Sequence, residues 1–284
     1  MIAIACPTDD AAPVGAAAAE ACELAVISDC HLGTRRCDGA ALLRYLRAIR
    51  PQRLVINGDL CDLGSYLTAH WPAEHLAVLR RIVGLANTGC EVVLVIGNHD
   101  AALAHSPLVP AGIRLLREHG LHYGGRVLRI VHGDIYDMAT CSSPLLRWLG
   151  GHGYDLLQRI EGLAGGAARL LRLPPPALVG PVKRRVPGAG RAMRRFQAAA
   201  LADARRQGDD GILTGHIHAP RLELDGHDQV LYANSGDWVE HRTALEGHDG
   251  VLRLVQVPAG GGPRTVLAQL PAALPAADRE AVLI

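Results

Sequence analysis

Three features are scarce or missing in this sequence, and each absence excludes a class of protein. No apolar run reaches the roughly 18 to 20 residues that a helix needs to cross a bilayer, so we expect no membrane-spanning helix. Aromatic residues make up only 4% of the chain, which leaves few side chains on which the bases of a nucleic acid could stack. None of the seven cysteines forms a C-x-x-C pair, and their odd number argues against a disulfide framework. We therefore expect a cytoplasmic protein with reduced cysteines and no nucleic-acid partner.

The first residues of the chain differ in composition from the rest. Residues 1–22 are rich in alanine, lack a basic start and are interrupted by Asp9 and Asp10, so we do not expect them to form a signal peptide. The whole chain of 284 residues is 49% hydrophobic and 20% charged, which is typical of a globular protein. We therefore expect an alanine-rich tail over residues 1–22 and one domain over residues 23–284.

Short apolar runs that end in polar or glycine residues recur along the domain and are typical of buried strands. These runs are residues 24–28, 54–57, 92–96, 127–131 and 211–214. Residues 39–49 and 74–87 lie between them and carry leucine and isoleucine at helical spacing. The alternation predicts an α/β fold with helices over a central sheet. After His218 the pattern changes to short strands and turns, which predicts a closing β section.

A residue that can bind a metal ion follows each of the five apolar runs directly. The candidate ligands are Asp29, His31, Asp59, Asn98, His132, His216 and His218. Any one of these clusters alone could cap a strand or form a turn. In α/β sheets, however, ligands bind at the carboxyl ends of the strands. Five clusters at that edge therefore favour a metal site. Oxygen and imidazole donors without thiolate suit Mn²⁺, Fe²⁺, Zn²⁺ or Mg²⁺. Seven ligands are too many for one ion, so two ions that share a carboxylate fit the count.

The segments SDCHLG, NGDLCDLG, GNHD, HGD and GHIHAP resemble, in this order across about residues 24–220, the motifs of the calcineurin-like metallophosphoesterases. The resemblance implies a two-sheet α/β sandwich flanked by helices, with the site at the carboxyl ends of the strands. It implies a first ion held by Asp29, His31, Asp59 and His218. It implies a second ion held by Asp59, Asn98, His132 and His216, so that Asp59 bridges the two.

A narrower resemblance concerns SDCHLGTRRCDGAALLRYL, HGDIYD and NSGDWVE, which are similar to segments of bacterial UDP-2,3-diacylglucosamine pyrophosphatase-like proteins. It implies a role in lipid A synthesis, in which a lipid-linked nucleotide pyrophosphate is cleaved to release UMP, usually with Mn²⁺. The best-known members carry arginine directly after the metal-binding asparagine, and this chain has His99 there. A general phosphodiesterase or phosphatase acting on nucleotides or other small phosphoesters is therefore the alternative function.

Catalysis is expected to proceed by attack of a hydroxide that bridges two divalent cations, which lower the pKa of water. His99 is the candidate that protonates the leaving oxygen, because imidazole titrates near neutral pH. Asp100 is expected to orient His99, with a helix N-cap as the alternative. Asp62 is expected to hold a ligand histidine in the correct tautomer, and Asp134 is expected to be a turn residue.

Residues 141–195 break the alternation and predict a basic helical insertion over the α/β body. Residues 145–207 hold twelve basic and three acidic residues, a net charge of +9, while the rest of the chain carries −8. One interpretation is a lid that contacts acyl chains or the inner face of an anionic membrane, with Arg194 and Arg195 as candidate substrate-binding residues. The alternative is a structural cap or the contact of a homodimer.

Overall fold

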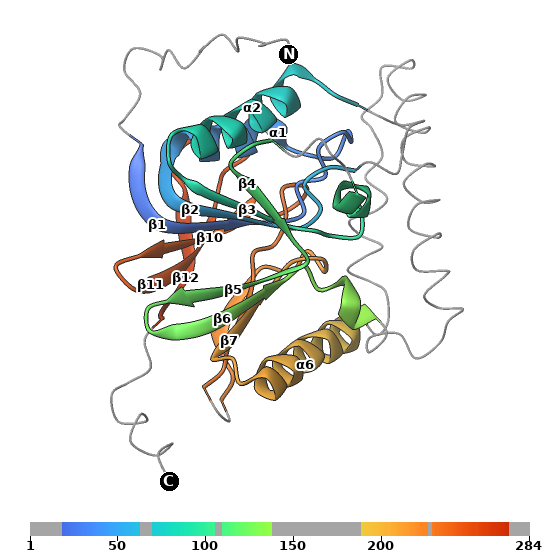
Figure 1. The fold of residues 1–284 in the computed structure, drawn as a ribbon, viewed down its shortest axis with the longest axis vertical. Coiled ribbons are helices and arrows are strands. Elements are labelled where there is room, and N and C mark those ends of the chain that lie inside the picture. The colour runs from blue at the N-terminus through green and yellow to red at the C-terminus, as the bar shows by residue number, and fades with distance from the viewer. Residues whose placement is uncertain (1–18, 63–69, 106–109, 138–188, 227–228, 273–284) are drawn as a thin grey trace, which may run out of the picture.

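The computed structural model describes residues 19–62, 70–105, 110–137, 189–226 and 229–272. These residues form two β-sheets that pack face to face, with helices against the outer face of each sheet (Figure 1). This arrangement confirms the predicted α/β sandwich flanked by helices. Most of the expected tail and most of the expected helical insertion lie outside the described residues.

The larger sheet has seven strands, of which four are parallel neighbours in the order β1, β2, β3 and β4. The strand order across the sheet is β12 (Thr265–Pro271), β11 (Val251–Gln256), β10 (Thr243–His248), β1 (Glu20–Ile27), β2 (Ile49–Asn57), β3 (Glu91–Val95) and β4 (Ile113–Leu116). Helices α1 (Gly39–Ala48) and α2 (Ala73–Asn87) connect β1 to β2 and β2 to β3. β10 pairs antiparallel with β1 and extends the sheet toward β12.

β1 begins earlier than the apolar run indicates. Glu20, which was expected in the tail, pairs with Ile49 of β2, and its carboxylate accepts a hydrogen bond of 2.7 Å from Arg264. Cys22 is buried in the same strand. The polar start of this strand is stabilised by pairing and by an arginine from the far end of the chain, neither of which a local pattern shows.

The smaller sheet has five strands and contributes the second half of the site. Their order is β5 (Glu118–Tyr123), β6 (Arg126–Val131), β7 (Gly211–Thr214), β9 (Leu231–Asn234) and β8 (Arg221–Leu224). β6, β7 and β9 are parallel, so the chain leaves β6 and β7 at the same edge of the sheet. Helix α6 (Ala189–Gln207) covers the outer face through Phe196 and Ala200, which pack against Ile212 and Tyr232.

The central strands are buried on both faces, which explains why they appear as continuous apolar runs. Along β2, Leu54 and Ile56 face the helices α1 and α2, whereas Val55 faces the smaller sheet. This alternation is the period of two that an extended strand imposes on its side chains. No helix in the described ranges is long and apolar enough to cross a membrane.

Candidate metal centre

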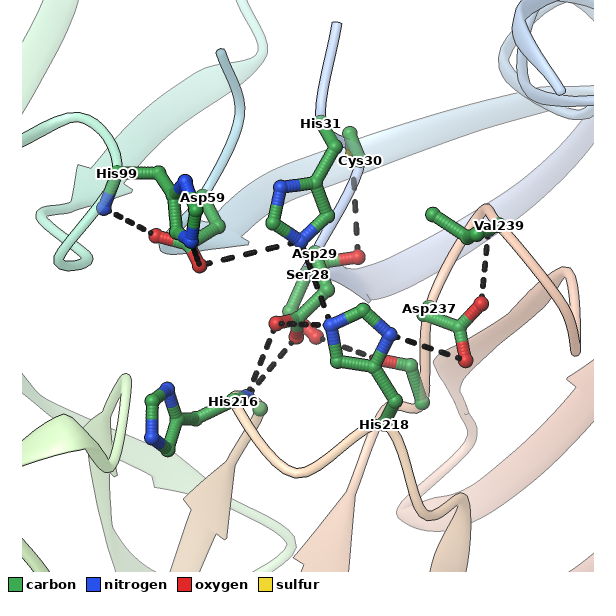
Figure 2. A network of polar contacts seen from close by, with 12 residues as sticks. Ser28, Asp29, Cys30, His31, Asp59, His99, His216, His218, Asp237 and Val239 are labelled. Atoms are coloured by element: carbon green, nitrogen blue, oxygen red, sulfur yellow. Dashed lines mark hydrogen bonds and ion pairs between the residues drawn. The ribbon is translucent and has the colours of Figure 1, made fainter. Parts of the chain in front are cut away.

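The candidate ligands lie in loops that leave neighbouring strands of the two sheets. Asp29 and His31 follow β1, Asp59 follows β2, Asn98 follows β3, His132 follows β6, and His216 and His218 follow β7. The sheets are packed so that these loops face one another, and Figure 2 shows side chains from both sheets pointing into one space. The fold therefore brings together residues that are up to 189 positions apart.

Three groups of possible ligand atoms form within this space, and two of them consist of candidate ligands only; the third joins His31 to Asp62 and His99. Asp29, His31 and His218 make the first group, and Asp59, His132 and His216 make the second; in each, one ligand atom per residue lies within 4.8 Å of the others. His218 Nε2 is 3.3 Å from Asp29 Oδ1 and 3.3 Å from His31 Nε2. The family resemblance implies these two sets with one more ligand in each, Asp59 for the first ion and Asn98 for the second.

Asp59 lies between the two groups. Its Oδ2 atom is 3.2 Å from His132 Nε2 in one group and 3.9 Å from His31 Nε2 in the other. Its Oδ1 atom accepts a hydrogen bond of 2.9 Å from the backbone N–H of His99. One carboxylate oxygen therefore faces both groups, which is the position that a bridging ligand requires.

Asn98 is exposed at the rim of the site, between Gly97 and His99. Its role as a ligand of the second ion stays a prediction.

The backbone is strained at five of the candidate ligands. Eight non-glycine residues in the described ranges have positive φ, and five of them are Asp29, His31, Asp59, His216 and His218, with φ between 50° and 66°. Such backbone conformations are unfavourable for residues with a Cβ atom and cluster at functional sites. The strain directs these side chains inward instead of letting them alternate along an extended segment.

His132 tests whether the residues fit a cation. Its Nδ1 is 2.8 Å from the carbonyl oxygen of Asn57, which can only accept, so Nδ1 carries a proton. The Nε2 atom is buried and lies 3.2 Å from Oδ2 of Asp59. Burial lowers the pKa of His132, but the carboxylates of Asp59 and Asp29 raise it to about 10, because a positive charge is favoured between Nε2 and Asp59. A divalent cation between these two atoms supplies that positive charge in place of a proton. The geometry of this pair therefore fits a metal ion.

The charges of the site match what a cation binds. Burial opposes ionisation of Asp29 and Asp59, but the neighbouring histidines, His218 for Asp29 and His132 for Asp59, lower the pKa of each carboxyl below its usual value. Burial, together with the charge of His218, lowers the pKa of His31 to about 4. At neutral pH Asp29 and Asp59 are thus ionised and His31 is neutral, as metal ligands are, whereas His132 has to release a proton when a cation binds.

The surroundings of His99 correct both roles expected for Asp100, as the partner of His99 and as a helix N-cap. Asp62, not Asp100, lies against the imidazole: His99 Nδ1 is 3.4 Å from Asp62 Oδ2, and this hydrogen bond raises the pKa of His99. The carboxylate of Asp100 is buried and instead accepts hydrogen bonds from the backbone N–H groups of Asp59 (3.0 Å) and Leu60 (3.4 Å). Asp100 therefore supports the loop that carries Asp59, and it does not cap a helix with its side chain.

Two further carboxylates were missed as partners of the ligands. Asp137 Oδ1 is 2.8 Å from His216 Nε2, directly after a short 3-10 helix (Asp134–Tyr136) that begins at Asp134, where a turn was expected. Asp237 is buried and lies 3.7 Å from His218 Nδ1. Burial opposes the charge of Asp237, but hydrogen bonding to His241 and the charge of His218 lower its pKa below the usual value. The segments HGDIYD and NSGDWVE were noted in the sequence, yet neither indicated these contacts.

Helix α6 borders the site through Phe196. The ring of Phe196 stacks on His216 with a centroid distance of 6.3 Å, and it also lies against Gly133. Arg194 and Arg195 are exposed on the same helix. Their role in substrate binding stays a prediction.

Replacing Gly97 with alanine is expected to disturb the site without touching a ligand. A Cβ atom at this position would lie 2.2 Å from Asp59 Oδ1 and 2.6 Å from its backbone nitrogen, so Asp59 would have to move. We expect the affinity for Mn²⁺, measured by titration calorimetry, to fall by at least about tenfold, and the protein to lose about 1–3 kcal/mol of stability. Gly84→Ala in α2 is the control, because nothing lies within 4 Å of a Cβ there. Unchanged Mn²⁺ affinity in Gly97→Ala would contradict the position assigned to Asp59.

Comparison with known proteins agrees with this geometry. A model of the calcineurin-like phosphoesterase family matches residues 23–220, and the chain belongs to this family. It is 29% identical over 231 residues to a UDP-2,3-diacylglucosamine hydrolase from Azotobacter vinelandii, a match that covers 75% of this chain and 89% of the relative. The chain is a metallophosphoesterase, a metal-dependent hydrolase of phosphoesters.

Two solved structures are also similar to this chain. The phosphoesterase Yfce from E. coli matches with a TM-score of 0.47 and 16% identity, over 88% of this chain and 99% of Yfce. Vps29 from Entamoeba histolytica, in a complex with Zn²⁺, matches with a TM-score of 0.43 and 16% identity, over 88% of this chain and 99% of Vps29.

Proposed function

We propose that this metallophosphoesterase hydrolyses a lipid-linked nucleotide pyrophosphate of the UDP-2,3-diacylglucosamine type and releases UMP. The observation that carries the proposal is the relative from Azotobacter vinelandii, which is named a UDP-2,3-diacylglucosamine hydrolase and matches across 89% of its own length. The arrangement of the candidate ligands supports a site for two divalent cations, and we propose Mn²⁺ as the ion.

In this proposal the side chains of the site hold the two cations, fix the orientation of the ligands and protonate the leaving oxygen of the substrate. Two bound cations supply positive charge that offsets the charge of the phosphoryl oxygens and lowers the pKa of water. Asp59 faces both ligand groups, and Asp100 fixes its loop through two backbone N–H groups. His99 is 38% exposed and its Nε2 is 4.0 Å from Asp59 Oδ2, so its proton can reach a leaving oxygen held beside the ligands.

The second candidate function is a phosphodiesterase or phosphatase acting on nucleotides or other small phosphoesters. The observation that favours it is His99, which stands where the best-known pyrophosphatases of the resembling group carry arginine. Arginine binds a phosphate through two parallel hydrogen bonds at once, whereas a histidine supplies a proton. The two functions therefore differ in what this position does for the substrate.

The test is UMP release from UDP-2,3-diacylglucosamine by the purified chain with Mn²⁺, measured beside hydrolysis of a chromogenic phosphodiester. We expect UMP release that stops when a chelator is added and that is absent in the Asp59→Asn variant, which controls for contaminating hydrolases. Hydrolysis of the chromogenic ester without UMP release would instead select the second function. If neither compound is hydrolysed, both candidate functions are wrong.

The proposals on where the protein is located and what it contacts depend on the basic segment 141–195, which the structure describes only in part. We propose that the basic segment 141–195 contacts the cytoplasmic face of a membrane, where the substrate's acyl chains would lie. The alternative, a cap or a homodimer contact, makes the same segment bind protein instead. Residues 141–188 of it lie outside the described residues.

A further inference from the structure

The loop between β9 and β10 packs directly against the first ligand group. The backbone N–H of Trp238 donates a hydrogen bond of 3.2 Å to the carbonyl oxygen of Asp29, and the carbonyl oxygen of Trp238 accepts one of 2.8 Å from Asp38. The side chain of Trp238 is fully buried in the core beneath α1 and α2. The loop is therefore fixed relative to the loop that carries Asp29 and His31.

The two carboxylate oxygens of Asp237, in this loop, have different partners. Oδ1 accepts hydrogen bonds from the backbone N–H groups of Val239 (2.8 Å), Glu240 (2.5 Å) and His241 (3.2 Å). Oδ2 faces two imidazoles. It is 2.5 Å from His241 Nδ1, and it is 3.7 Å from His218 Nδ1, the contact that Figure 2 shows. One oxygen thus holds the loop, and the other is directed at the side of His218 that points away from Asp29.

We propose that Asp237 is a positioning residue that keeps the proton of His218 on Nδ1, so that the lone pair of Nε2 faces the cation site beside Asp29. The inference rests on the proposed function, because it takes His218 as a metal ligand. Histidines that bind metals commonly direct their second ring nitrogen at a carboxylate, which fixes the tautomer and the ring orientation. At 3.7 Å the contact is longer than a hydrogen bond, but the negative charge of Asp237 still favours a proton on Nδ1 of His218.

The variant Asp237→Asn separates this role from the structural role of the same side chain. Asparagine keeps a carbonyl oxygen for the three backbone N–H groups of the loop, but it directs an NH₂ donor at Nδ1 of both His241 and His218. Nδ1 of His218 then has to accept, and the proton moves to Nε2, which can no longer bind a cation. We expect the melting temperature of the metal-free chain to change little, while the affinity for Mn²⁺, measured by titration calorimetry, falls about 10- to 100-fold.

Asp210→Asn is the matched control, because Asp210 Oδ2 accepts a 2.7 Å hydrogen bond from the backbone N–H of Val127 at the opposite end of β7. We expect wild-type Mn²⁺ affinity in this variant and a clear loss of one bound ion in His218→Ala. If Asp237→Asn binds Mn²⁺ as tightly as the wild type while His218→Ala does not, the positioning role is wrong and the metal site stands. If His218→Ala also binds like the wild type, the proposed ligand set is wrong.

A measurement on the unchanged chain keeps the inference testable if Asp237→Asn fails to fold. ¹⁵N-histidine NMR of the metal-free wild-type protein in alkaline buffer reports the tautomer of each neutral ring, and the signal absent in His218→Ala assigns His218. We expect a proton on Nδ1 and none on Nε2. A proton on Nε2 of His218 would overturn the inference.

Discussion

Replacing Asp59 with asparagine is expected to abolish turnover and metal loading together. Oδ2 of this residue faces His132 at 3.2 Å and His31 at 3.9 Å, so one substitution removes the carboxylate charge that the two ligand groups share. The neutral amide of asparagine would also face His132 and His31 without the negative charge that binds a cation between them. We expect kcat to fall by at least about a thousandfold, equivalent to about 4 kcal/mol of transition-state stabilisation, and bound Mn²⁺ to drop from two ions toward none.

Asp249→Asn is the matched control for this substitution. Asp249 is exposed, and its φ of 49° is close to the 53° of Asp59, so both changes place asparagine in the same left-handed backbone conformation. Any effect of that conformation is thus common to the two variants. Metal content by elemental analysis and initial rates with saturating Mn²⁺ are measured side by side. If the Asp59→Asn variant keeps two bound ions and a measurable kcat, Asp59 does not bridge the two ions.

Replacing His99 with glutamine is expected to leave both ions bound and to lower kcat about 10²- to 10⁴-fold, the range for the loss of a general acid. The hydrogen bond to Asp62 raises the pKa of His99, so more of it is protonated at neutral pH than of an ordinary histidine. The ring is also partly open to solvent, where a substrate can reach it. His122→Gln, on the exposed side of β5, is the control and is expected to have no effect.

The choice of substrate makes the test of His99 sharper. A leaving group such as p-nitrophenolate needs no proton, whereas an alkoxide does. We expect His99→Gln to hydrolyse a p-nitrophenyl ester at nearly the wild-type rate and an alkyl ester far more slowly. Equal losses on both esters would show that His99 binds or orients the substrate and does not protonate the leaving group.

The strands that carry the site could be predicted from the sequence because the information is local. Strands of a parallel sheet that are buried on both faces have to be apolar throughout, and the five apolar runs overlap β1, β2, β3, β6 and β7. The ligand types and their places after these strands were then enough to indicate the two groups that the structure brings together.

Other strands could not be predicted because their partners come from distant parts of the chain. β10 is buried along its whole length, yet it contains Glu246 and His248 and shows no apolar run. Glu246 is paired with Arg264 at 2.7 Å and with His248 at 2.9 Å, which compensates for its burial. β5 and β12 lie at the edges of their sheets, where solvent permits a polar sequence.

The residues around the ligands were harder to predict than the ligands themselves. The sequence placed Asp100 next to His99 and suggested a contact, but the structure turns Asp100 toward the backbone of Asp59 and places Asp62 against the imidazole. Side-chain direction in these loops depends on positive φ at residues such as Asp29 and Asp59, which sequence periodicity does not report. Asp237 is likewise close to His218 only because β9 and β7 are neighbours.

The central claim is that side chains from five loops hold a pair of divalent cations with Asp59 between them. Anomalous diffraction from a crystal of the wild-type chain grown with Mn²⁺ tests it directly. We predict two peaks on the Asp59 carboxylate, about 3.5–4 Å apart, one beside His31 and His218 and the other beside His132 and His216. The absence of anomalous peaks there, or a single peak away from Asp59, would contradict the account.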